Sequence, residues 1–226
     1  MLVQEFLTGD EYVVDTVTLN GKTVTCNVFS YEKERANGAD FVYRAIRAID
    51  LSSPISQKLI AYNNEVIKAV GIFQGAGHRE IMLTDNEPCL VEIGARLHGG
   101  NIPSIVQKCA PWSQIELLID ACIDQRLFEQ KSKQQLHLDK KFLIHFYISS
   151  KEGMIEIIKN NHLITSLDSY FDSIWYRGTG DYLDKTIDLY TCPLKIILAN
   201  RNKELLLRER NSLIDIEKKS LLFRLR

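Results

Sequence analysis

Two β-rich runs joined by an Asn-Gly pair constrain the fold of this chain more than any other local pattern. The runs EYVVDTVTL (11–19) and KTVTCNVFSY (22–31) flank Asn20 and Gly21, a dipeptide that favours the left-handed backbone of a two-residue hairpin turn. A third extended run, DFVYRAIRAI (40–49), alternates roughly between apolar and polar residues. These patterns predict an antiparallel sheet in the N-terminal part of the chain.

Helical and extended patterns alternate in the rest of the chain, so the predicted fold class is α+β. Apolar residues 3–7 also have a strand-like composition. A helix is predicted after Ser52 or Ser53, with Pro54 in its first turn. Its predicted apolar face consists of Ile55, Leu59, Tyr62, Val66 and Val70. The later elements predicted from periodicity are strands at 78–84, 88–94 and 193–199, helices at 102–110 and 111–124, a hairpin of strands 141–149 and 154–159, and a terminal helix capped by Asn200 or Asn202.

The domain organisation is predicted from a change in composition. Residues 126–140 are polar and rich in Gln and Lys, which is typical of a linker. The chain is therefore divided into an antiparallel-rich body (1–125), a linker (126–140) and a small α+β module (141–226).

The overall composition excludes several classes of protein. The 226 residues are 45% hydrophobic and 25% charged, with a net charge of -1, so there is no electrostatic reason to expect nucleic acid as a partner. No run approaches the roughly 18 apolar residues of a membrane-spanning helix, and the N-terminus has no leader pattern. The five scattered cysteines favour a reducing, cytoplasmic location and argue against a disulfide framework.

A pair of carboxylates is predicted to meet in the second hairpin. Antiparallel pairing across the turn 85–87 puts Met82 opposite Leu90 and Glu80 opposite Glu92. Opposed residues have Cβ atoms about 5 Å apart, so two carboxylates there repel each other unless one is protonated or a cation lies between them. Oxygen ligands of this kind suit Mg²⁺. The alternative is a register slipped by one residue, which would leave both acids solvated.

The stretch that follows Glu92 adds positive charge and bare backbone. Arg96 comes four residues after Glu92, and Gly99 and Gly100 precede the predicted helix 102–110. Glycines let backbone N–H groups approach a ligand closely, and a helix N-terminus attracts anions. A Gly-Gly pair alone indicates only a tight turn, but in this combination it favours a site for a polyphosphate or an acyl phosphate.

These motifs resemble the C-terminal half of an ATP-grasp carboxylate–amine ligase, nearest to the bacterial L-amino-acid and dipeptide ligases. The resemblance spans nearly the entire chain and rests on these stretches in order: VQEFLTGDEYVVDTV with the NGK hairpin, YEKERANG, GAGHREIML, PCLVEIGARLHGG and KTIDLYTCP. It implies ATP bound between two α+β subdomains, transfer of the γ-phosphoryl group to a carboxylate, and attack by an amine on the acyl phosphate. It also implies that this chain begins at the hinge and lacks the N-terminal domain and the first ATP-grasp subdomain.

The resemblance implies a nucleotide site near the N-terminus. Gln4, Glu5, Phe6 and Leu7 would form the hinge under adenine, with backbone groups of Glu5 and Leu7 reading its edge and Phe6 packing beside it. Glu11 would bind the ribose hydroxyls. Without that context, Glu11 is an ordinary exposed strand acid.

The resemblance also implies a metal and transfer site. Glu80 and Glu92 would hold Mg²⁺ or Mn²⁺ against the phosphates, and Arg96 would be catalytic, stabilising the transferring phosphoryl group and the tetrahedral intermediate. Gly94 stands where many members of the family have Asn, which leaves a second metal in question. The substrate pocket would include His78, His98, Gly99 and Gly100. A structural role for His78 is the alternative, since no titratable group adjoins it in the sequence.

Two functions remain open. The first is an ATP-dependent ligase that forms an amide or peptide bond, present as a C-terminal part that is inactive alone. The second is a catalytically inactive interaction or regulatory module that keeps the fold; purine-pathway or carboxylase chemistry is a weaker third. The expected partners are nucleotide, small carboxylate and amine substrates, and a separate chain that supplies the N-terminal half. Exposed apolar surface would also favour a homo-oligomer.

Overall fold

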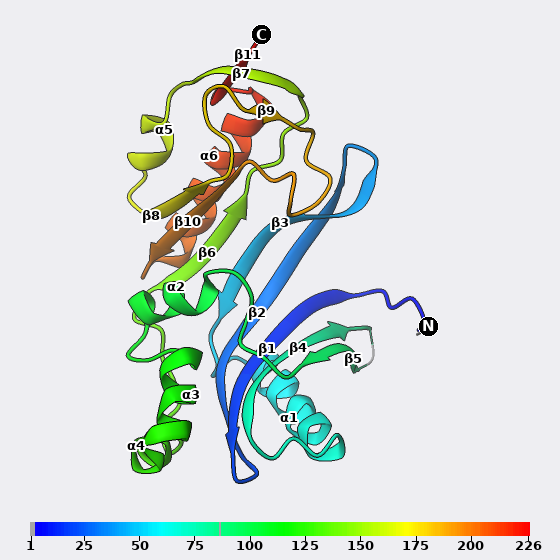
Figure 1. Ribbon diagram of the computed structural model, residues 1–226, viewed down its shortest axis with the longest axis vertical. Helices are drawn as coiled ribbons and strands as arrows, with labels where there is room; N and C mark the ends of the chain where they lie inside the picture. Colours follow the sequence, from blue (N-terminus) through cyan, green and yellow to red (C-terminus); the bar gives the residue numbers. More distant parts are fainter. Residues whose placement is uncertain (1–2, 86) are drawn as a thin grey trace. The chain divides into compact units, whose positions relative to one another are not determined.

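The computed structural model describes residues 3–85 and 87–226 and confirms the α+β class with an antiparallel sheet (Figure 1). Its strands are β1 (Asp10–Leu19), β2 (Lys22–Ala36), β3 (Ala39–Ile49), β4 (Gly75–Leu83), β5 (Pro88–Gly94), β6 (Lys141–Phe146), β7 (Gly153–Ile158), β8 (Tyr170–Trp175), β9 (Tyr182–Leu183), β10 (Leu194–Asn200) and β11 (Phe223–Leu225). Its helices are α1 (Pro54–Ala69), α2 (Ile102–Cys109), α3 (Gln114–Ile123), α4 (Gln125–Lys131), α5 (His162–Thr165) and α6 (Lys203–Lys218). No helix in the described part of the chain has the length and apolar character needed to cross a bilayer.

The chain divides into two compact units that differ from the predicted division. Unit 1 contains the residues up to Ser30 together with Ala48–Asp139, and unit 2 contains Tyr31–Arg47 and Lys140–Arg226. The long strands β2 and β3 therefore contribute to both units. The predicted linker 126–140 falls in unit 1, where most of α4 occupies its first half and Phe128 is fully buried. The composition did not predict this helix because most of its residues are polar and only Phe128 is buried.

The sheet of unit 1 is built on the predicted N-terminal hairpin. Its strand order is β5-β4-β1-β2. Asn20 and Gly21 have φ values of 51° and 77°, the two left-handed residues that a tight β1–β2 hairpin requires. Residues 3–7, predicted to be strand-like, lie outside the strands, and β1 begins only at Asp10. From Val13 onward every residue of β1 is buried, so this strand is covered on both faces.

Helix α1 begins where the sequence predicts but turns a different face to the core. Ser53 caps the helix and accepts a hydrogen bond from the Ser56 N–H at 3.3 Å. The buried residues are Ser56, Leu59, Asn63 and Ile67. Of the predicted apolar face, Leu59 is buried, Ile55, Tyr62 and Val66 are half-buried, and Val70 is exposed. The Tyr62 hydroxyl accepts a hydrogen bond from the Leu90 N–H of β5 at 2.9 Å. This bond holds the Tyr62 side of α1 against the sheet.

Unit 2 has its own hydrophobic core. Its part of the eight-stranded sheet has the strand order β2-β3-β6-β10-β8, and a second sheet has the order β11-β7-β9. Apolar residues of β6, β10 and α6 contribute to one core cluster, which includes Leu143, Ile196, Leu198, Leu206 and Leu213. The prediction that the strands at 141–149 and 154–159 form a hairpin was wrong. Both edges of β6 are occupied, by β3 and β10, so β7 pairs with β11 and β9 instead.

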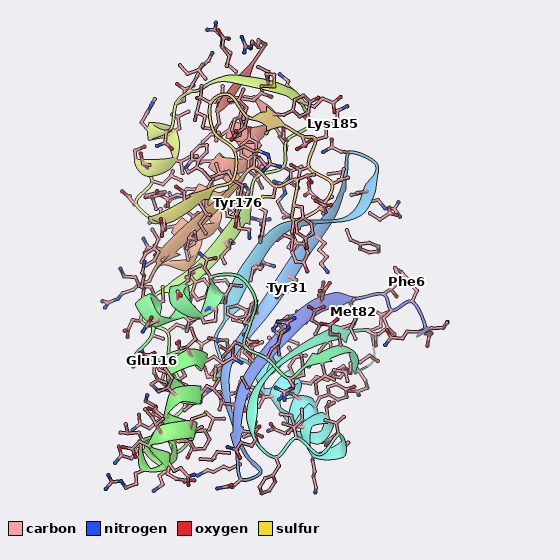
Figure 2. All side chains as sticks on the ribbon, in the orientation of Figure 1. Phe6, Tyr31, Met82, Glu116, Tyr176 and Lys185 are labelled. Carbon is pink, nitrogen blue, oxygen red and sulfur yellow. The ribbon has the colours of Figure 1, made fainter. Side chains whose placement is uncertain are left out.

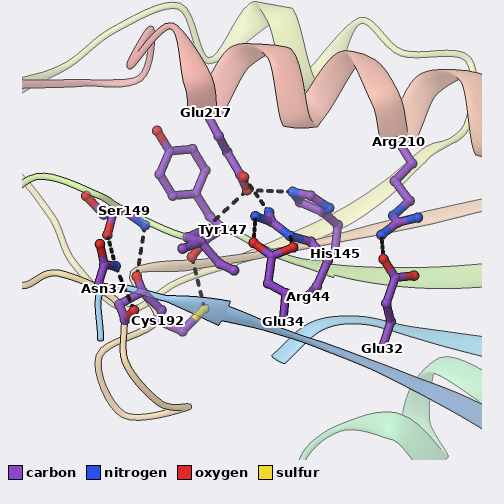
Figure 3. A network of polar contacts seen from close by, with 12 residues as sticks. Glu32, Glu34, Asn37, Arg44, His145, Tyr147, Ser149, Cys192, Arg210 and Glu217 are labelled. Carbon is purple, nitrogen blue, oxygen red and sulfur yellow. Dashed lines mark hydrogen bonds and ion pairs between the residues drawn. The ribbon is translucent and has the colours of Figure 1, made fainter. Parts of the chain in front are cut away.

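A buried polar network links α6 to the sheet of unit 2 (Figure 3). Glu217 of α6 accepts hydrogen bonds from Arg44 of β3 and, at 3.2 Å, from the Ile148 N–H, and lies 2.7 Å from His145 Nε2. The Arg44 guanidinium also donates to Glu34 through two nitrogens, at 2.6 and 3.0 Å. Burial alone would lower the pKa of Arg44, but its bonds to Glu34 and Glu217 raise it. The hydrogen bonds from Arg44 in turn hold the pKa of Glu34 below its usual value.

Candidate functional site

The β4–β5 hairpin brings the two predicted metal ligands together. Glu80 and Glu92 are directly paired, as the sequence predicts, but Met82 faces Cys89 and not Leu90. A bulge after Glu80 explains both outcomes: near the turn the register is one residue away from the predicted one, and the extra residue Val91 restores it before Glu92. The two carboxylates therefore lie on neighbouring strands, with side-chain exposures of 22% and 56%.

Arg96 folds back towards this carboxylate pair. Its Nη2 atom lies 3.7 Å from Glu92 Oε1, and its Nη1 atom donates to the Leu97 carbonyl at 3.1 Å. A Cβ atom at Gly94 would lie only 3.2 Å from Arg96 Cγ and 3.3 Å from Nε. The glycine found where the family often has Asn thus leaves room for the arginine. Gly100 has a φ of 65°, so the turn after Arg96 uses a left-handed residue.

A pocket lies at the other end of the same hairpin. Its volume is about 450 Å³, and its lining residues are Gln4, Glu5, Phe6, Leu7, Met82, Cys89, Leu90 and Val91. Gln4 Nε2 donates a hydrogen bond to the Val91 carbonyl at 3.3 Å, which fixes the N-terminal segment against β5. Figure 2 labels Phe6 and Met82 on this part of unit 1. The four residues predicted to form the hinge therefore do line a mostly apolar pocket.

Glu11, the predicted ribose ligand, lies at the start of β1. It pairs with Met82 of β4, so it lies directly opposite a lining residue of the pocket. Glu11 itself is not among the lining residues in the described chain, and its contact with ribose stays a prediction.

The interior beneath the hairpin holds a cluster that the sequence did not reveal. Asp15 of β1 is fully buried, and its two carboxylate oxygens lie 2.9 Å from His78 Nδ1 and 2.8 Å from His98 Nδ1. His78 Nε2 in turn lies 3.5 Å from Glu80 Oε1. His78 and His98 are 2% and 7% exposed, so they lie in the interior, and their predicted contact with substrate stays untested. The only signal in the sequence was an acid inside the apolar run VVDTV.

The charges in this cluster stabilise one another. Burial alone would raise the pKa of Asp15, but its electrostatic interaction with His98 and its hydrogen bonds with both histidines lower it. For His78, burial alone would lower the pKa, yet hydrogen bonds to Asp15 and Glu80 raise it to about 9. These bonds favour the protonated form of His78, whose Nε2 atom lies beside Glu80.

Among the described residues of this region, two sets of side chains could hold a metal ion. Glu80 and Glu92 offer only oxygen, which suits Mg²⁺ or Mn²⁺ with phosphate oxygens completing the shell. Asp15, His78 and His98 offer one oxygen and two nitrogens within 4.8 Å of one another, a set that suits transition metals. Because both oxygens of Asp15 already lie at hydrogen-bond distance from the histidines, this second set has the geometry of a hydrogen-bonded network. The Glu pair is the better candidate for a metal site.

Comparison with known proteins identifies the family to which the region around this site is similar. Residues 1–105 match the family model described as an ATP-grasp domain. This region is an ATP-grasp domain. The segment predicted to be the hinge, the Glu80–Glu92 pair, Arg96 and the Asp15 cluster all lie within these matched residues, and the predicted resemblance to an ATP-grasp domain is confirmed for this region.

Relatives of the ATP-grasp domain extend the similarity over the rest of the chain. Dapdiamide A synthase of Enterobacter agglomerans is 30% identical over 219 residues, which are 96% of this chain and 51% of the relative. The crystal structure of L-amino acid ligase from Bacillus licheniformis has a TM-score of 0.79 at 18% identity, covering 98% of this chain and 55% of that one. Phosphoribosylglycinamide synthetase from Anaerococcus prevotii has a TM-score of 0.72 at 17% identity, with the same coverage. The chain thus spans about half the length of these relatives, and the two structures show the fold alone.

Proposed function

We propose that this chain provides the nucleotide- and metal-binding part of an ATP-dependent carboxylate–amine ligase. The observation that carries the proposal is the direct pairing of Glu80 and Glu92 on β4 and β5. The pair lies on the same hairpin as the pocket lined by Gln4–Leu7, and Arg96 is 3.7 Å from Glu92. A base pocket, two metal ligands and a guanidinium in this order fit a bound Mg–ATP.

Each part of this site has a role in the proposed binding. Adenine occupies the pocket, where backbone groups of Glu5 and Leu7 read its edge and Phe6 packs against it. Glu11 binds the ribose hydroxyls, and Glu80 and Glu92 would hold Mg²⁺ or Mn²⁺, which would neutralise negative charge on the phosphates.

The proposed reaction forms an amide bond in two steps. A substrate carboxylate oxygen attacks the γ-phosphorus of ATP, ADP leaves, and an acyl phosphate forms. An amine then attacks the acyl carbon, and inorganic phosphate leaves with the electron pair of the broken C–O bond. Arg96 stabilises the negative charge that develops in both steps, and the turn at Gly99 and Gly100 borders the substrates. The name of the L-amino acid ligase favours amino-acid substrates, and the scattered free thiols favour the cytoplasm.

The chain alone should show no amino-acid-dependent release of ADP. Stabilising a transferring phosphoryl group requires positive charge on several sides, and this chain spans about half the length of its relatives. The measurement is a coupled ADP-release assay over the common amino acids, with the chain alone and with a polypeptide that supplies the N-terminal half. Turnover that appears only in the mixture supports the proposal, whereas steady turnover by the chain alone contradicts the predicted dependence.

The assay also separates the ligase from the alternative, an inactive interaction module. A ligase half binds Mg–ATP even when it cannot turn over, so equilibrium binding of the nucleotide is measured on the same preparation. If the chain shows neither binding of Mg–ATP nor turnover in the complemented mixture, the interaction module is the better description.

Mg–ATP should protect Cys89 from alkylation. Cys89 lines the pocket and is partly exposed, whereas Cys122 is exposed outside it. At a nucleotide concentration of about ten times Kd, the rate at Cys89 should fall about tenfold because only the free form reacts. The rates are measured by iodoacetamide labelling and peptide mass spectrometry.

The other thiols serve as internal controls for this labelling. The rate at Cys122 should be unchanged by nucleotide. Burial raises the pKa of the Cys192 thiol to about 11 and raises that of Cys26 well above its usual value, so both should stay unlabelled at pH 8. Equal slowing at Cys89 and Cys122, or no slowing at Cys89, would contradict nucleotide binding in this pocket.

A further inference from the structure

We propose that Asp15 is a positioning residue that ties the strand bearing Glu80 to the turn bearing Arg96. Asp15 makes this connection through His78, which lies on the strand, and His98, which lies in the turn. This inference rests on the proposed function, because it assigns a purpose to the cluster only if Glu80 and Arg96 act on Mg–ATP.

The carboxylate of Asp15 is shared between two segments of the chain. Its Oδ1 atom lies 2.9 Å from Nδ1 of His78 on β4, and its Oδ2 atom lies 2.8 Å from Nδ1 of His98 in the turn after β5. The rings of the two histidines pack edge to face with centroids 4.5 Å apart. Phe29 of β2 closes the cluster with an edge-to-face contact to His98 at 5.3 Å. The cluster is therefore rigidly packed as well as hydrogen-bonded.

Each histidine is two residues from a group of the proposed site. His78 precedes Glu80 by two residues on the same strand and face, and its Nε2 atom reaches Glu80 Oε1 at 3.5 Å. His98 follows Arg96 by two residues in the turn. Fixing the two histidines to one carboxylate thus limits how far Glu80 and Arg96 can move relative to each other.

A second buried side chain holds the turn in the same place. Gln114 of α3 is fully buried. Its Oε1 atom accepts the His98 N–H at 3.0 Å, and its Nε2 atom donates to the carbonyls of Thr16 and Gly77, each at 3.1 Å. Gln114 therefore connects the backbone of the turn to the residues that follow Asp15 and precede His78. The same three segments are joined twice, once by a carboxylate and once by an amide.

Aspartate is the residue type that this tie requires. A carboxylate accepts hydrogen bonds at both oxygens, whereas Asn offers one acceptor and turns an NH₂ group towards the other partner. Asp15→Asn keeps the volume of the side chain but removes its negative charge and one of the two acceptors on which the histidines converge. Partners that orient metal ligands in this way typically change metal affinity by about 10- to 100-fold when they are replaced.

The experiment compares Asp15→Asn with Asp120→Asn in the same chain. Asp120 is also a buried acid of unit 1 and pairs with Lys131 at 2.5 Å, so its change to Asn is chemically matched but lies outside the cluster. Amide hydrogen exchange followed by mass spectrometry reports the freedom of residues 95–101. The Mg²⁺ concentration that gives half of the nucleotide-dependent thermal shift reports the alignment of the site.

For Asp15→Asn we expect faster exchange confined to residues 95–101 and an increase of about 10-fold or more in the half-effective Mg²⁺ concentration. For Asp120→Asn we expect neither change. Exchange at 95–101 equal to that of the unaltered chain, or faster exchange spread evenly over unit 1, overturns the inference. If Asp15→Asn does not fold, His98→Gln, which removes the imidazole that joins Asp15 to the turn and keeps the bond of Asp15 to His78, is tested for the same exchange pattern and the same change in the half-effective Mg²⁺ concentration. An unaltered chain that shows no response to Mg–ATP contradicts the proposed function itself, which is a separate result from the exchange pattern.

Discussion

Replacing Glu217 by Ala should lower the free energy of unfolding by about 3–5 kcal/mol, the usual cost of removing one partner from a buried ion pair. Glu217 is 8% exposed and accepts from Arg44, His145 and the Ile148 N–H. Without it, His145 and the Ile148 N–H lose this acceptor in the interior, and Arg44 keeps only Glu34. The measurement is equilibrium unfolding in denaturant, followed by circular dichroism.

Glu156→Ala is the control for this change. Glu156 also pairs with an arginine, Arg224, at 2.6 and 3.0 Å, but their side chains are 41% and 54% exposed. An exposed pair contributes about 0–1 kcal/mol, so this variant should unfold almost like the unaltered chain. Equal losses in the two variants would show that the network around Glu217 does not stabilise unit 2 beyond an ordinary surface pair.

Glu92→Gln should remove most of the thermal stabilisation that Mg–ATP gives. A ligand at about 100 times its Kd adds about 2.7 kcal/mol to stability, and each kcal/mol raises Tm by about 2–4 °C in a chain of this size. Because Glu80 and Glu92 are paired on neighbouring strands, both are expected to bind one ion. Glu80→Gln should therefore act like Glu92→Gln, and the double variant should add little.

The control for the carboxylate pair lies on the same hairpin. Glu87 is an acid next to the turn, 74% exposed and 3.3 Å from Lys58. Glu87→Gln should leave the shift with Mg–ATP unchanged. In metal-free buffer Glu92→Gln should cost little stability, since it also removes the repulsion between the two acids. Full retention of the metal-dependent shift in Glu92→Gln would mean that the pair is not a metal site.

The pairing of Glu80 with Glu92 was predicted correctly, although the register from which it was derived was wrong near the turn. The period of two along each strand predicted the partners correctly, but the turn closes one residue earlier than expected, with Leu83 opposite Pro88. The bulge at Val91 compensates for the difference. Bulges depend on tertiary packing and leave no pattern in a single sequence, so the pocket end of the hairpin could not be placed correctly.

The Asp15 cluster shows where a single sequence stops being informative. Asp15 is 63 residues from His78 and 83 residues from His98, and no spacing rule joins such positions. The pairing of β1 with β4 brings the first two together, and the turn after β5 brings the third. Local signals, by contrast, were sufficient for the Asn20-Gly21 turn and for the start of α1, because both depend on the backbone preferences of a few adjacent residues.

The connection between β3 and α6 has a consequence for biosynthesis. Arg44 and Glu217 are 173 residues apart, and on a ribosome adding about 5–20 residues per second the arginine waits roughly 10–35 s for its partner. During that time the β2–β3 hairpin has emerged with Glu34 beside the arginine, while the helix that supplies its second carboxylate, Glu217, has not been made. Unit 2 therefore completes its fold only when the C-terminal end of the chain leaves the exit tunnel. A nascent chain that stalls before α6 would present an unfinished sheet to the cell's chaperones and proteases.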